Sequence, residues 1–68
     1  MKPSIQYLYW IEFKYTGPFE GEPNFKHGFY STSPNPKYVT RTANNYMKKH
    51  HIPAEIVTIA EPQMYFRF

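Results

Sequence analysis

The chain has 68 residues, a net charge of +3 and no cysteine. A chain of this length forms one domain, so we predict a single domain over residues 1–68. The lack of cysteine excludes disulfides, cysteine-ligated zinc sites and thiol catalysis, and it fits a reducing compartment, so we expect a cytoplasmic protein. The pI near 9.3 favours acidic partners but is too modest to indicate nucleic acid by itself.

Aromatic residues supply much of the apolar material, with one Trp, seven Tyr and six Phe. The first ten residues, MKPSIQYLYW, contain no uninterrupted apolar run, so we expect neither a signal peptide nor a membrane span. Because the chain can form no disulfide, its stability must come from packing of aromatic and aliphatic side chains, and burial against a partner would add to it.

The stretch from Ile5 to Tyr15 has the alternation of a strand with one buried face. Its apolar odd positions are Ile5, Tyr7, Tyr9, Ile11, Phe13 and Tyr15. The even positions should be polar, and Gln6, Glu12 and Lys14 are. Leu8 and Trp10 are the two exceptions, which indicates a second use for the other face.

Residues Thr16–Asn24 contain two Gly and two Pro and predict a long hairpin connection with Phe19 at its tip. The chain then re-enters a strand at Phe25–Thr32, which should pair antiparallel with the first. Within this strand, Gly28 indicates a bulge or a close approach of another group.

A helix start follows, because Asn35 can cap and Pro36 suits the first helical position. Ser33 with Pro34 is an equally good start. The helix should present Val39, Ala43, Tyr46 and Met47 to the core, and Lys48 to His51 should close it. Ile52 lies outside the helix because it precedes Pro53.

Ala54–Ala60 is short and β-branched, which predicts a third strand, and Met64–Phe68 predicts a fourth after the turn at Glu61–Gln63. The predicted fold is α+β in the order ββαββ. It has a small antiparallel sheet of three to four strands with one helix packed on one face.

One helix covers one face of such a sheet, so the other face is the predicted binding surface. There Leu8 and Trp10 would meet Tyr30 and Tyr65. The full set of predicted partner-binding residues is Leu8, Trp10, Lys14, Phe19, Lys26, Tyr30, Tyr65 and Arg67. Aromatic residues are enriched in protein interfaces. We therefore expect a small non-enzymatic protein-binding module of the inhibitor or adaptor type, an accessory regulator that binds a protein partner or a second copy of itself.

The alternative is a nucleic-acid-binding module, since aromatic rings among cations can stack on unpaired bases. A second basic surface would lie along the helix, formed by Lys37, Arg41, Asn45 and Lys48. The simpler explanation of these residues is a solvated helix face whose last turn complements the helix dipole.

Catalysis is not expected, because the chain lacks Cys and Asp. His50 and His51 are adjacent, so on a helix they would point about 100° apart and could not grip one metal ion. His27 should lie at the rim of the core. Glu20 and Glu22 are more simply a solvated turn than a calcium site. We predict no cofactor and no metal.

Overall fold

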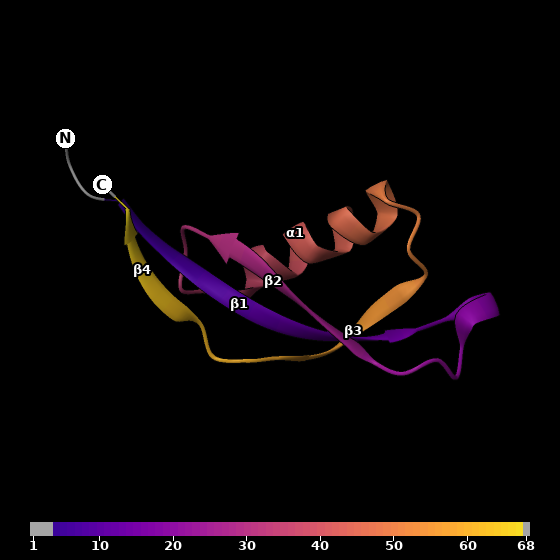
Figure 1. Ribbon diagram of the computed structural model, residues 1–68. Helices are drawn as coiled ribbons and strands as arrows, with labels where there is room; N and C mark the ends of the chain where they lie inside the picture. Colours follow the sequence, from indigo (N-terminus) through magenta and orange to yellow (C-terminus); the bar gives the residue numbers. More distant parts are fainter. Residues whose placement is uncertain (1–3, 68) are drawn as a thin grey trace.

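The computed structural model describes residues 4–67, except for the side chain of Arg67, and confirms the predicted ββαββ order. It is a small α+β fold with one helix and a four-stranded antiparallel sheet (Figure 1). Its elements are β1 (Ser4–Tyr15), η1 (Gly17–Phe19), β2 (Phe25–Ser31), α1 (Pro36–Lys49), β3 (Ala54–Ile59) and β4 (Gln63–Arg67). Phe68, predicted to end the last strand, lies outside the described residues. No helix within residues 4–67 is long and apolar enough to cross a membrane.

Strand β1 is the centre of the sheet. On one edge it pairs with β2, from Tyr7 opposite Ser31 to Phe13 opposite Phe25. On the other edge, β3 pairs with the C-terminal part of β1 and β4 pairs with its N-terminal part. The two short strands thus follow one another along a single edge. The Ala60 N–H donates to the Trp10 carbonyl at 3.0 Å, which ties the break between them to β1.

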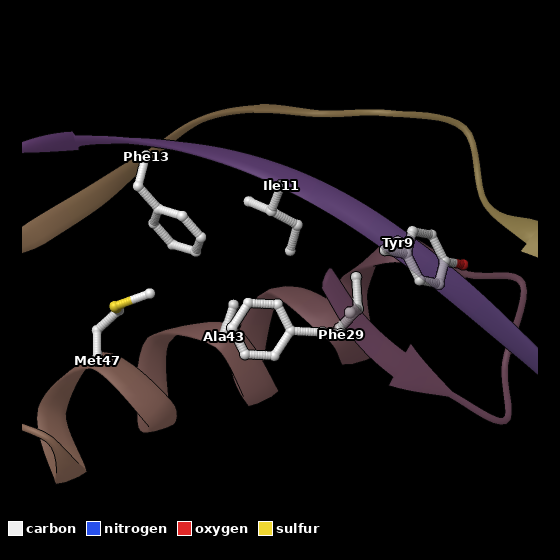
Figure 2. Packing of buried hydrophobic residues seen from close by; sticks show 7 residues of the cluster. Tyr9, Ile11, Phe13, Phe29, Ala43 and Met47 are labelled. Atoms are coloured by element: carbon white, nitrogen blue, oxygen red, sulfur yellow. The ribbon is translucent and has the colours of Figure 1, made fainter. Parts of the chain in front are cut away.

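The core lies between α1 and the face of the sheet that carries the odd residues of β1. Figure 2 shows Tyr9, Ile11 and Phe13 directed toward the helix. The buried cluster consists of Tyr9, Ile11, Phe13, Phe29, Val39, Ala43 and Met47. Alternation in the strand and the helical spacing of Val39, Ala43 and Met47 both predicted this packing, and the structure confirms it.

Both ends of α1 are formed by local hydrogen bonds. The Asn35 side chain accepts from the Lys37 N–H at 3.0 Å, so Asn35 is the N-cap, and Pro36 takes the first position. Ser33 does not cap; its Oγ accepts from the Asn35 N–H at 3.1 Å and so holds the cap residue.

At the C-terminal end, the Ile52 N–H donates to the Met47 carbonyl and the His51 N–H to the Lys48 carbonyl. This pair of bonds is a Schellman motif, which requires a left-handed residue after the cap, and His51 has φ 55°. Glycine usually takes this position because it has no Cβ, so His51 is an exception.

The helix covers only part of the sheet. A helix of 14 residues is about 21 Å long, whereas a strand of 12 residues spans about 40 Å. The N-terminal end of β1 and the paired β4 therefore extend past α1 (Figure 1). Ile5, expected to meet the helix, is 44% exposed, and Met64 and Phe66 beside it are also exposed.

Candidate protein-binding surface

Leu8 and Trp10 lie on the face of the sheet opposite α1, which we call the open face. In the ladder with β2, Leu8 is opposite Tyr30 and Trp10 is opposite Gly28. Their neighbours Tyr9 and Ile11 point into the core, so alternation directs Leu8 and Trp10 to the other side. Trp10 is 45% exposed, whereas Leu8 is buried. Leu8 therefore supports the surface from below, and Trp10 forms part of it.

Gly28 allows the indole to lie close to the sheet. A Cβ on Gly28 would be 3.0 Å from Cδ1 of Leu8 and 3.2 Å from Cζ3 of Trp10. Of the two expected explanations for this glycine, close approach is the one that the structure shows. The irregularity of the sheet lies elsewhere, in the β1–β3 ladder between Glu12 and Phe13.

Two tyrosines from different strands meet on the open face, and one of them, Tyr30, is diagonal to Trp10 in the β1–β2 ladder. Tyr30 of β2 and Tyr65 of β4 have ring centroids 6.4 Å apart in an edge-to-face arrangement. The Tyr65 hydroxyl donates to Oε1 of Gln63 at 2.9 Å, and Gln63 is opposite Leu8 in the β1–β4 ladder. We call Trp10, Tyr30 and Tyr65 the aromatic platform. Each of the three side chains remains about half exposed.

Two lysines of the open face, Lys14 and Lys26, lie across the sheet ladders from glutamates. Nζ of Lys14 lies 2.9 Å from Oε1 of Glu55, and this hydrogen bond together with the attraction of the Glu55 carboxylate raises the pKa of Lys14. Lys26 is opposite Glu12, whose Oε2 accepts from the Asn24 side chain. The face therefore combines an aromatic half with a half in which charges alternate in sign.

Two predicted partner-binding residues stand apart from this platform. Phe19 packs beside Tyr15, with ring centroids 6.2 Å apart, at the opposite end of β1. Tyr15 is opposite Ala54 and belongs to the helix side of the sheet, so Phe19 does not join the open face. The backbone of Arg67 pairs with Ser4 next to Tyr65, while its side chain is outside the described part of the structure.

The basic residues of α1 lie on the other side of the molecule from the platform. Each member of the predicted stripe is exposed: Lys37, Arg41, Asn45 and Lys48. Helix α1 contains four cations and no acidic residue. The sheet separates this positive surface from Trp10.

The histidines occupy structural positions. His27 stacks on Phe29 at 4.5 Å between ring centroids and has Nδ1 2.9 Å from the Gly28 carbonyl, at the rim of the core as predicted. His50 packs against Tyr46 at the end of α1. Across residues 4–67, no group of three metal-ligating side chains is close enough to hold a metal ion. The absence of enzymatic activity and of a cofactor stays a prediction.

Sequence reasoning missed two contributors to the surface. The sequence predicts Gln63 in a turn, but it begins β4 and accepts a hydrogen bond from the Tyr65 hydroxyl. The sequence does not predict Glu55 as the partner of Lys14, because that pairing depends on the β1–β3 register. The sequence signal for Gln63 and Glu55 is weak, because each is simply a polar residue within a strand of alternating polarity.

Comparison with known proteins gives no relationship to build on. No protein-family model, no curated protein and no solved structure matches the chain significantly.

Proposed function

We propose that the protein is a non-enzymatic protein-binding module that binds its partner through the aromatic platform. The observation that carries this proposal is the presence of three half-exposed aromatic rings on the open face, where Tyr30 and Tyr65 meet edge to face and Trp10 lies beside the buried Leu8. Large aromatic rings on a rigid sheet bury much apolar area at little cost in side-chain entropy, which is why they dominate protein interfaces. The lack of cysteine favours a cytoplasmic setting for this role.

The charge distribution favours a protein over a nucleic acid. Binding of a single strand combines base stacking with phosphate contacts on one surface. Here Lys14 is paired with Glu55 and Lys26 faces Glu12, whereas α1 carries four cations and no acidic residue. A partner with an apolar patch and a mixed-charge rim fits this surface better than a polyanion does.

The partner is either a different protein or a second copy of this chain. Trp10 is the only tryptophan, so its fluorescence reports on the platform directly. A dilution series from high micromolar to nanomolar concentration distinguishes the two cases: a concentration-dependent emission shift, matched by sedimentation, identifies self-association. An emission independent of concentration directs the search to another protein.

Site-specific photo-crosslinking in an extract of the source cells tests the proposal. A crosslinking side chain at position 30 should capture a discrete partner, and the Trp10→Ser substitution should abolish capture. Position 45 is the matched control, because Asn45 is also exposed but lies on α1, on the other side of the sheet from Tyr30. Equal capture at both positions, or capture that survives Trp10→Ser in a folded variant, would contradict the proposal.

An oligonucleotide titration tests the alternative. A mixed single-stranded DNA at low salt should leave the Trp10 emission unchanged. Quenching that disappears steeply as salt is raised would instead indicate nucleic-acid binding at the platform.

A further inference from the structure

A concave surface, separate from the aromatic platform, lies at the far end of the sheet, around the β1–β2 connection. We call it the tip hollow. It has a volume of about 680 Å³ and is lined by Tyr15, Phe19, Glu22, Pro23, Phe25, His51, Ile52 and Pro53. Tyr15 and Phe25 belong to the helix side of the sheet, so the hollow shares neither the face nor the end of the aromatic platform. Figure 1 shows this connection projecting beyond β2 and β3.

A ladder of aromatic rings forms one wall of the tip hollow. Phe13 of the core stacks on Phe25 at 5.2 Å between centroids, Phe25 contacts Tyr15 at 4.9 Å, and Tyr15 contacts Phe19 at 6.2 Å. The first ring is fully buried and the last is 51% exposed. The exposed ring is thus connected to the core through packed neighbours and is held ready for a ligand.

The opposite wall is the connection between α1 and β3, and backbone bonds fix its position. The Thr16 N–H donates to the Pro53 carbonyl at 2.8 Å, which joins this wall to the end of β1. The Ile52 N–H donates to the Met47 carbonyl at 2.9 Å, which joins it to the helix. A cleft whose walls are both fixed loses little conformational entropy on binding.

His51 lines this wall in the left-handed conformation, with φ 55°. Glycine would adopt that conformation without strain, and a side chain there is disfavoured by contact with its own backbone. Strained residues that persist in a fold cluster at functional sites. The observation that the strained side chain borders the tip hollow points to a use for this surface.

One carboxylate lines the hollow, and two more lie beside it. Glu22 lines it, and Glu20 and Glu22 also border the adjoining depression with Glu55. The cation in that depression is Lys14, which is engaged by Glu55. The charge that complements these carboxylates is positive.

We propose that the tip hollow binds an extended, proline-rich and basic segment of another protein. Proline rings of a polyproline II segment pack against Tyr15 and Phe19, and an Arg or Lys pairs with Glu22. Aromatic grooves suit such segments because the polyproline II helix is extended before binding and loses little entropy. This inference is independent of the role proposed for the aromatic platform.

Fluorescence anisotropy with a labelled decapeptide tests it. The probe alternates Pro-Pro and Arg, one matched peptide replaces every Arg by Glu, and another replaces every Pro by Gly. We expect the probe to bind at micromolar concentrations and both matched peptides to bind at least about tenfold more weakly. If the peptide with Gly in place of Pro binds as well as the probe, charge attraction alone explains the binding, and the proposal is overturned.

Variants of the full chain locate the binding. Phe19→Ser should weaken binding about tenfold or more, because truncation of an anchor ring removes most of the buried area. Glu22→Gln should weaken it about threefold and reduce its salt dependence. The matched control is Trp10→Ser, which should leave affinity unchanged, and circular dichroism confirms that each variant is folded.

Three results would overturn the inference. Full affinity of a folded Phe19→Ser variant would exclude the hollow. Loss of binding in Trp10→Ser would move the site to the platform. Self-association abolished by Phe19→Ser would assign the hollow to a second copy of the chain instead.

Discussion

Gly28 and Trp10 are direct partners across β1 and β2, and a Cβ on Gly28 would lie only 3.2 Å from Cζ3 of the indole. Cδ1 of Leu8 would lie 3.0 Å from the same Cβ. Because Gly28 has no side chain, the indole of Trp10 on the neighbouring strand can pack directly over the backbone of β2. The platform depends on this relationship because the indole rests on backbone and keeps its outer half free for a partner.

Gly28→Val should destabilise the fold by about 1–3 kcal/mol, because the added methyl groups must displace the indole or Leu8. It should also shift the Trp10 emission. Urea denaturation measures the first effect. The same substitution in a Trp10→Ala background should cost less, by at least about 0.5 kcal/mol, since residues in contact do not act additively. An identical cost in both backgrounds would show that the contact is not the cause.

His51→Gly should stabilise the protein by about 1 kcal/mol, because glycine adopts φ near +55° without the contact between Cβ and the backbone. For a domain of this size that corresponds to a rise in Tm of about 4–8 °C. His50→Gly is the control, since the cap residue His50 has φ −95° and gains nothing from glycine. If both substitutions change Tm equally, strain at position 51 is not responsible.

Asn35→Ala should cost about 1 kcal/mol, because it leaves the Lys37 N–H without its acceptor at the N-terminus of α1. Asn35→Asp should retain stability, since its carboxylate accepts the same bond and the first turn has no acidic residue. Urea midpoints with unchanged m-values would show that only native stability differs. A loss of stability in the Asp variant equal to that in the Ala variant would argue against the cap.

Tyr9→Phe should cost about 1 kcal/mol at neutral pH, because the hydroxyl donates to the Ser33 carbonyl at 3.0 Å. Burial, and secondarily the neighbouring Tyr7, raise the pKa of Tyr9 above 10.0. The unfolded chain therefore loses this proton first as pH rises, so the wild type is destabilised above pH 10 through Tyr9. The variant lacks that effect.

The stability difference between wild type and Tyr9→Phe should accordingly shrink above pH 10, as measured by urea denaturation across the alkaline range. Tyr38→Phe is the matched control, because its ring is 57% exposed and it should change stability little at neutral pH. A difference that grows with pH would contradict the assignment of the shifted group.

The order of elements followed from local properties of the sequence. The alternation from Ile5 to Tyr15 determined β1, and the Asn35–Pro36 pair determined where α1 begins. Such features act over a few residues, because hydrogen-bond caps, backbone restriction by proline and side-chain period involve near neighbours. The placement of Trp10 on the open face followed from the same alternation.

Tertiary structure alone decided which distant residues meet. Strand β4 pairs with the first half of β1, which brings Tyr65 to Tyr30, and β3 pairs with the second half, which brings Glu55 to Lys14. Phe19, predicted as an additional partner-binding anchor, belongs to another surface because the connection after β1 folds toward the helix side. Strand register depends on contacts between segments far apart in the chain, so no local pattern could fix these positions.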